Sequence, residues 1–142
     1  MSVNKTVTEK SKAEEQIITF KDGLYGFEDI KEYVLLQEDD SKTIWSLQAA
    51  HSSVPSFVVV NPYMIMEDYS PILSHDDLKE LGMPKDEDIC FLAVTVLKDN
   101  MEDSVVNLKS PIVINAMTRQ AKQIILENND YPIRCKLFPS LK

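Results

Sequence analysis

Apolar residues along this chain fall mostly into short runs with the spacing of β-strands. Between Thr43 and Ala49, the residues Trp45, Leu47 and Ala49 alternate with polar ones, which is typical of a strand with one buried face. Trp45 is therefore expected in the core. The FVVV run at 57–60 has no alternation and predicts a strand that is covered on both faces.

A second group of strands is predicted around Pro111. Val105–Leu108 and Ile112–Ile114 are rich in β-branched residues, whose stiff side chains suit a packed, pleated surface. Proline cannot donate to a sheet ladder, so Pro111 is expected at a strand start, an edge or a bulge. Asn107 and Asn115 interrupt these apolar neighbours, so their amides must be hydrogen-bonded or face solvent.

The rest of the chain adds more short strands and one helix. Strands are expected at 17–20, 33–37 and 133–137, an apolar run fills 89–97, and residues 27–31 could form one helical turn. At 74–82, Ser74 can cap a short helix, acidic residues suit its first turn, and Gly82 can end it. Many strands with one short α-helix near 74–82 predict an all-β fold that is mainly antiparallel and barrel-like.

The distribution of polar and apolar residues predicts where the domain begins and in which compartment the protein is found. Residues 1–16 are polar and charged, so they are expected to form a mobile N-terminal tail, with 17–142 as a single β-barrel-like domain. The tail has no apolar stretch typical of a signal peptide, and no run is long enough to cross a membrane. A cytoplasmic protein is expected, in which Cys90 and Cys135 are two reduced core thiols, and a disulfide between them is the less favoured alternative.

The charge of the chain limits the kinds of partner it can have. Its net charge is −8, from 23 acidic and 15 basic residues. Direct binding to nucleic acid is not expected, since neutralising phosphates needs clustered lysine and arginine. The acidic balance fits a basic protein partner, and it also fits simple solubility.

The motifs of catalysis and of metal binding are not found in this sequence. His51 and His75 are far from each other and from any cysteine at ligand spacing, and Cys90 lies in an apolar run where a buried, inert thiol is expected. We therefore expect no cofactor, no metal and no enzymatic activity. A small hydrolase that uses a cross-strand pair of acids is a less favoured alternative.

A protein-binding surface is the remaining kind of site, and two turns offer candidates for it. Exposed aromatic residues with polar neighbours often anchor such surfaces. Tyr25 and Tyr69 are expected to be the least buried, because turn residues surround both, although core packing is an open alternative for every candidate. The candidate partner-binding residues are Leu24, Tyr25, Phe27, Tyr63, Glu67, Asp68, Tyr69 and Asn107.

Four segments of the chain resemble the FliW flagellar assembly factor family. They are DGLYGFEDIKEYVLL at 22–36, FVVVNPYMIMEDY at 57–69, VNLKSPIVIN at 106–115, and the IIL and YPIR pieces within 124–134. The segments occur in the order of the family and span most of the chain. For residues 118–126, helix propensity and the resemblance disagree, and the resemblance predicts a strand.

The resemblance implies a regulator that is not an enzyme. Members of the family are understood to bind the RNA-binding translational repressor CsrA and to antagonise it. They also bind flagellin, so that free flagellin releases CsrA to repress flagellin translation. The expected partners are therefore CsrA and flagellin, with the free protein a monomer. A flagellin-specific chaperone with no role in translation is the alternative.

Overall fold

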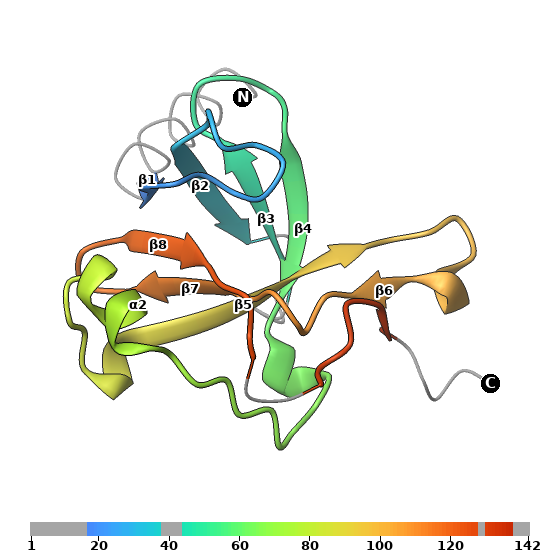
Figure 1. The fold of residues 1–142 in the computed structure, drawn as a ribbon. Coiled ribbons are helices and arrows are strands. Elements are labelled where there is room, and N and C mark those ends of the chain that lie inside the picture. Colours follow the sequence, from blue (N-terminus) through green and yellow to red (C-terminus); the bar gives the residue numbers. More distant parts are fainter. Residues whose placement is uncertain (1–16, 38–43, 128–129, 138–142) are drawn as a thin grey trace.

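The computed structural model describes residues 17–37, 44–127 and 130–137 (Figure 1). The tail predicted at 1–16 lies outside the described residues. None of the described helices combines the length and the apolar content that a membrane span needs.

The described chain is mostly β-structure, as the pattern of apolar residues predicts. Within the described residues, α2 (His75–Glu80) is the one α-helix, and three single 3-10 turns join strands. The strands are β1 (Ile17–Phe20), β2 (Glu32–Gln37), β3 (Ile44–Ala49), β4 (Ser56–Val60), β5 (Ile89–Val96), β6 (Val105–Val106), β7 (Ile112–Asn115), β8 (Gln120–Gln123) and β9 (Cys135–Lys136).

Seven of these strands close into a barrel in the order β4-β3-β2-β1-β8-β7-β5, with β5 returning to β4. All neighbours in it are antiparallel except β1 and β8, which run parallel. The second half of β5 continues beyond the barrel and pairs with β6, which in turn pairs with β9 (Figure 1). The predicted all-β, mainly antiparallel, barrel-like fold is confirmed.

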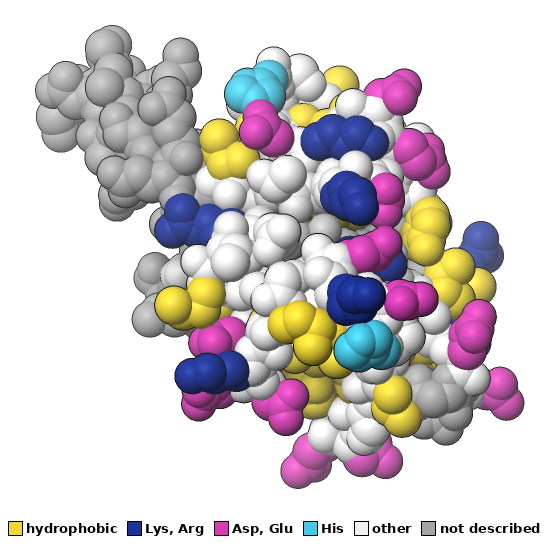
Figure 2. All heavy atoms as spheres, turned by 60° about the vertical axis from the view of Figure 1, so that its left-hand side comes forward, with side chains coloured by type: hydrophobic (Ala, Val, Ile, Leu, Met, Phe, Trp, Pro, Cys, Tyr) yellow, Lys and Arg dark blue, Asp and Glu magenta, His cyan; other side chains and the backbone are white. Residues whose placement is uncertain are grey.

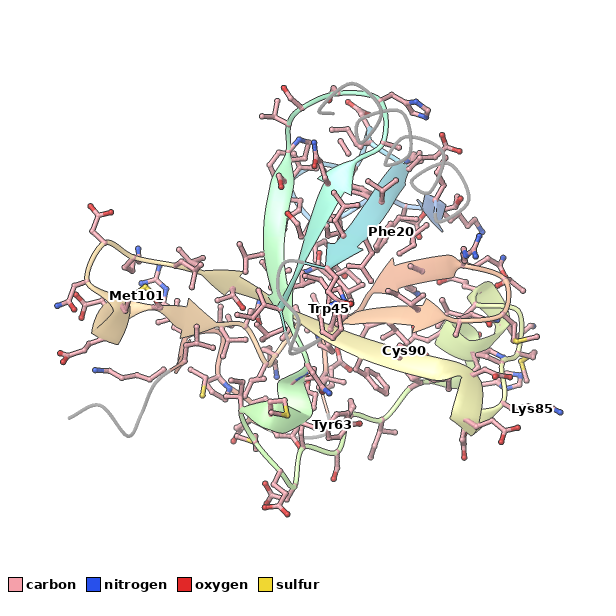
Figure 3. All side chains as sticks on the ribbon, turned by 180° about the vertical axis from the view of Figure 1, so that it is seen from behind. Phe20, Trp45, Tyr63, Lys85, Cys90 and Met101 are labelled. Atoms are coloured by element: carbon pink, nitrogen blue, oxygen red, sulfur yellow. The ribbon has the colours of Figure 1, made fainter. Side chains whose placement is uncertain are left out.

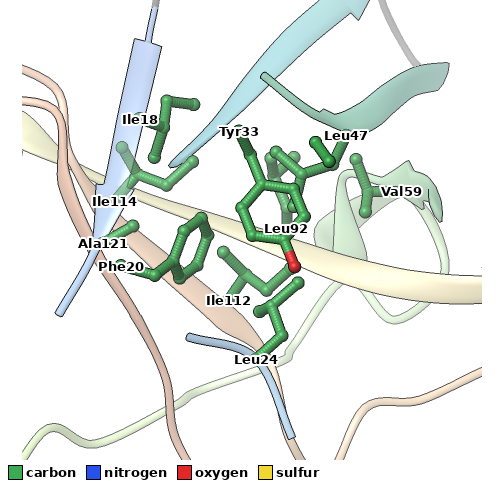
Figure 4. Packing of buried hydrophobic residues seen from close by; sticks show 11 residues of the cluster. Ile18, Phe20, Leu24, Tyr33, Leu47, Val59, Leu92, Ile112, Ile114 and Ala121 are labelled. Atoms are coloured by element: carbon green, nitrogen blue, oxygen red, sulfur yellow. The ribbon is translucent and has the colours of Figure 1, made fainter. Parts of the chain in front are cut away.

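The barrel interior holds the first of two apolar clusters. Phe20, Tyr33, Leu47 and Ile112 are fully buried in it, and Figure 4 shows the Tyr33 ring lying among aliphatic side chains from opposite walls. Phe20 and Tyr33 meet edge to face, with ring centres 5.3 Å apart. Trp45 packs against this cluster but is only partly buried, so it lies at the margin of the core and not in its centre.

The second cluster lies on the outer face of β5 and β7. Ala93 and Val113 contribute to it, whereas their neighbours Leu92 and Ile112 point into the barrel. The segment that follows β4 and the segment that follows β8 cover this face (Figure 1). Both strands are therefore apolar on both faces, which explains their lack of alternation.

Local predictions from turn and cap residues are mostly confirmed, with one exception. Ser74 caps α2 in a reciprocal arrangement with Asp77, and Gly82 has a positive φ of 82° just after the helix. Pro111 comes directly before β7. The helical turn considered at 27–31 is wrong, because Phe27 pairs with Leu24 in a bridge and β-type turns continue to β2.

The disputed segment 118–126 contains a strand and no helix. Its strand, β8, pairs with β7 on one side and β1 on the other, and Ala121 enters the barrel core. These two neighbours decide the conformation against the helix propensity of Gln, Ala and Lys.

Candidate protein-binding surface

The connection between β1 and β2 presents two aromatic side chains to solvent. Gly23 has a φ of 68°, and a Cβ there would come within 2.7 Å of the Glu28 backbone, so this turn needs glycine. Tyr25 is 53% exposed and Phe27 is 40% exposed. The Phe27 ring is held edge to face against Phe57 on β4, with centres 5.4 Å apart. The two side chains are therefore exposed on a well-anchored turn.

Leu24 does not belong to this exposed set. It is 3% exposed and packs in the barrel core, so its expected place at a partner surface is corrected to a structural one. The bridge between Leu24 and Phe27 reverses the chain, and this turns Leu24 inward while Tyr25 stays outside.

An aromatic cluster follows β4, and it contains Tyr63 and Tyr69. The two rings meet edge to face at 5.7 Å, and Tyr69 lies 4.7 Å from the ring of Tyr131. Tyr69 is only 3% exposed, and its hydroxyl donates to the Leu108 carbonyl at 2.7 Å. Burial raises the pKa of Tyr69 well above its ordinary value.

The expectation that Tyr69 is not deeply buried is therefore wrong. Turn residues surround it, as the sequence indicates, but this segment folds back over the outer face of β5 and β7. The ring thereby enters the second apolar cluster. Tyr63 remains 40% exposed, and burial of its remaining surface raises its pKa.

The polar candidates differ in what they can offer a partner. Glu67 and Asp68 are exposed in the same segment as Tyr63. Asn107 is half-buried, and its side-chain oxygen accepts from the backbone N–H groups of Lys109 and Ser110, both at 3.0 Å. Asn107 thus shapes the turn before β7, as expected for a satisfied amide.

A cavity of about 750 Å³ opens at one end of the barrel. Trp45, Tyr63 and Cys90 border it from three different parts of the chain, and Figure 3 shows them near the middle of the molecule. Met101 lies far from them, at the tip of the β5–β6 hairpin (Figure 3). Ile114 contributes an apolar wall, and Arg119, with a left-handed φ of 63°, borders the same opening.

The sequence analysis missed this cavity, in part because it placed Cys90 in the core. Cys90 is exposed, which contradicts that expectation. Its side chain lies on the same face of β5 as Leu92, but at the open end of the barrel, where β4 no longer covers the strand. Pro62 could have predicted that β4 ends early and leaves part of β5 uncovered, since proline cannot continue a sheet ladder.

One group of charged contacts joins α2 to the barrel. Lys122 on β8 bonds to Asp77 at 2.7 Å and also to Glu80, which ties α2 to the barrel. No group of three His, Cys, Asp or Glu side chains that could hold a metal ion occurs among the residues described. On the face that carries α2 and β8, basic and acidic side chains are interspersed, and no basic patch forms there (Figure 2).

Comparisons with known proteins agree with this geometry. The family model described as "FliW protein" matches residues 2–137. The chain belongs to the FliW family. A flagellar assembly factor FliW from Caldicellulosiruptor saccharolyticus is 34% identical over 129 residues, covering 91% of this chain and 84% of that protein. The corresponding protein of Natranaerobius thermophilus is 37% identical over 126 residues, covering 88% of this chain and 83% of its own.

A solved structure supports both the family and the fold. The crystal structure of the flagellar assembly factor FliW superposes with a TM-score of 0.83 and 30% sequence identity, and the match covers 91% of this chain and 90% of that one. The described residues therefore have the fold of a solved FliW structure over most of their length.

Proposed function

We propose that this protein binds and antagonises the translational repressor CsrA and also binds flagellin, thereby coupling the level of flagellin to its translation. Membership of the FliW family supports a role in flagellar assembly. The protein acts in the cytoplasm, as a monomer when free, through contacts with other proteins. It needs no cofactor and does not bind RNA directly.

The observation that carries the proposal is the set of rigidly held, half-exposed aromatic rings. Phe27 and Tyr63 are each 40% exposed and each is held edge to face against another ring, so little side-chain entropy is lost when a partner covers them. Tyr25, Glu67 and Asp68 supply the polar rim of these surfaces. Leu24 and Tyr69 act beneath them, by fixing the backbone that presents the exposed residues, and Asn107 shapes the turn before β7.

Calorimetric titration of the full chain with CsrA and with flagellin tests the proposal. Each partner is titrated alone and again with the other at saturation. We expect both to bind and each to weaken the other by the same factor, because coupling free energies are reciprocal. Binding of flagellin alone would favour the chaperone alternative, and two independent affinities would remove the regulatory switch.

Substitutions at the aromatic residues locate the surface. Phe27→Ser and Tyr63→Ser are expected to weaken at least one partner by about tenfold or more, which corresponds to about 1.4 kcal/mol. Met117→Ser is the matched control, because Met117 is 75% exposed but belongs to neither turn. An equal effect of all three substitutions would place the interface elsewhere.

A further inference from the structure

In the part of the chain that the structure describes, no strand lies beside the first half of β5 on the edge that borders the barrel-end cavity. The β4–β5 ladder pairs Val58 with Thr95 and Val60 with Ala93, and it ends there. Residues 89–92 of β5 all border the cavity. Side chains of successive strand residues point to opposite faces, so a cavity that all four border runs along the strand edge and not over one face.

The register of the sheet shows which backbone groups point toward this open edge. The Asp88 carbonyl accepts from the Ala116 N–H, and the Val94 carbonyl accepts from the Asn107 N–H. The backbone N–H and carbonyl groups of even-numbered residues in this strand therefore point toward β7 and β6, and those of odd-numbered residues point to the opposite edge. The N–H and carbonyl of Phe91 and the carbonyl of Ile89 point to the opening. The Ile89 N–H donates to the Asp86 carbonyl instead.

Proline at position 62 explains why β4 stops short. The next hydrogen-bonded pair of the ladder would join Phe91 to Pro62, which has no N–H to donate. The Pro62 carbonyl instead accepts from Ile65 and Met66 in the turn after β4. Among the described residues, no backbone hydrogen bond extends the β4–β5 ladder past Val60 and Ala93. The sequence thus ends β4 while β5 continues.

We propose that this open edge is a docking site for an extended segment of a partner protein, which adds to β5 as an antiparallel strand in the position that β4 vacates. Its backbone pairs with Phe91 and Ile89. One side chain enters the cavity against Trp45 and Ile114, and the next lies outside over Tyr63. Main-chain bonds supply affinity in this mode, and alternate side-chain pockets supply selectivity.

The chemistry around the edge describes the segment that fits. The cavity walls near Trp45 and Ile114 are apolar, so the inward side chain is aliphatic or aromatic. Asp86 borders the cavity, and Glu87 next to it is also exposed. On the described cavity wall, Asp86 and Arg119 balance each other, and the exposed Glu87 beside Asp86 leaves a net negative charge at the opening, so a lysine or arginine in the segment is favoured. The proposal goes beyond the proposed function and does not depend on which proteins supply the segment.

Selection from a random library of linear peptides tests the proposal directly. The bait is the full chain carrying Cys135→Ser, so that Cys90 is the one remaining thiol. Selected peptides are expected to alternate apolar and polar positions, to carry a lysine or arginine, and to shift the emission of Trp45, the only tryptophan in the chain.

Amide exchange measured by NMR distinguishes strand addition from other modes of binding. A bound peptide is expected to slow exchange of the Phe91 N–H by about tenfold or more. The Leu92 N–H faces β7 already, so its exchange is the internal control. Peptides that bind without protecting Phe91 would overturn the proposal, as would a selection that enriches no peptide.

Blocking the edge chemically provides the complementary test. Alkylation of Cys90 with N-ethylmaleimide places a bulky group in the opening and is expected to weaken peptide binding by about tenfold. The control is the same alkylation at Ser52→Cys in a chain with Cys90→Ser and Cys135→Ser, since Ser52 is exposed and does not border the cavity. Equal effects at the two positions would contradict docking at β5.

The outcomes for the two proposals are separable. If CsrA and flagellin bind but no peptide protects Phe91, strand addition fails and the proposed function stands. If peptides dock at β5 but neither protein binds, the proposed function fails and the docking site stands. If a second copy of the chain covers the edge instead, sedimentation shows a dimer that Cys90 alkylation dissociates, and docking of a partner segment is overturned.

Discussion

Among the described residues, buried polar side chains bond to backbone groups, with one exception in the barrel core. Asn115, which is 2% exposed, donates to the Leu81 carbonyl at 2.7 Å and accepts from the Met117 N–H at 3.0 Å. The Tyr69 hydroxyl donates to Leu108. The Tyr33 hydroxyl is fully buried and has no hydrogen-bond partner among the described residues, and burial raises its pKa. An unpaired buried hydroxyl costs folding free energy.

Removing that hydroxyl is therefore expected to stabilise the protein. Tyr33→Phe keeps the ring, with its edge-to-face contact to Phe20, and should raise the free energy of unfolding by about 1 kcal/mol. Tyr69→Phe is the matched control and should lower it by a similar amount, because it breaks a bond to Leu108. Urea unfolding of the three proteins measures both changes. A loss of stability in Tyr33→Phe would mean that the hydroxyl is satisfied in solution.

At the scale of one element, α2 illustrates how far local sequence signals reach. Ser74, Asp77 and Gly82 predict its start and end, because caps act within a few residues. The contact that fixes its position cannot be predicted in this way, since Lys122 lies 45 residues after Asp77. Burial alone would raise the pKa of Asp77, but hydrogen bonds from Lys122 and Ser74 outweigh it and hold the pKa below its ordinary value. The pKa of Lys122 is raised in turn, although burial alone would lower it.

Loss of this lysine should destabilise the protein in a pH-dependent way. We expect Lys122→Met to lower the free energy of unfolding by about 1–2 kcal/mol at neutral pH. A carboxylate with a lowered folded pKa contributes stability above the ordinary value of about 3.9, and this contribution is lost as the pH falls through the folded pKa. The deficit of the variant should therefore shrink in acid.

The raised pKa of Lys122 sets the upper end of the pH range over which the ion pair stabilises the protein. Its contribution is complete below the ordinary lysine pKa of about 10.4 and is lost only as the pH rises through the higher folded pKa. Lys79→Met is the control, because Lys79 is an exposed residue of α2 and its loss changes the net charge equally. Thermal unfolding across pH measures both variants, and equal deficits in the two would contradict a specific role for the ion pair.

The sequence predicts strands where it shows which of their faces are buried. It does not predict the exposed surface of the site. The FVVV run and the β-branched residues around Pro111 predict β4 and β7 because burial dictates their composition. The exposure of Cys90 and the burial of Tyr69 depend on which segment covers which strand, and that is a long-range property. The sequence pattern shows how apolar each residue is, but it does not show which distant segment covers that residue in the folded chain. Exposure at the site depends on that coverage.

At the scale of the whole molecule, two apolar clusters share β5 and β7, and two groups of exposed acidic residues lie in connections between strands. Glu67 and Asp68 lie exposed near the aromatic cluster. Asp99, Glu102 and Asp103 are exposed at the end of the β5–β6 hairpin, which projects from the barrel (Figure 1). Both groups stand far enough from the cores for their charge to be changed without disturbing packing.

These acids provide a test of how the proposed antagonism of CsrA would operate. If the protein keeps RNA away from CsrA partly by electrostatic repulsion, exposed acids near the docked surface matter more for RNA exclusion than for binding. The test variants are Glu67→Gln with Asp68→Asn, and Asp99→Asn with Glu102→Gln and Asp103→Asn. Each keeps the shape of the side chains and removes their charge. The control is Asp76→Asn, which neutralises an exposed acid on α2, outside both groups and outside the turn that carries Tyr25 and Phe27.

Binding to CsrA and release of RNA are then measured separately at low and moderate salt. Exposed ion pairs contribute at most about 1 kcal/mol, so CsrA binding should weaken only modestly and become less sensitive to salt. Release of RNA from CsrA should fall by more than binding does in at least one test variant, and the control should change neither quantity. If both test variants displace RNA as well as the parent protein at both salt concentrations, repulsion plays no part. The antagonism would then have to be steric or conformational, because the −8 net charge would affect only solubility and the rate of encounter with basic partners.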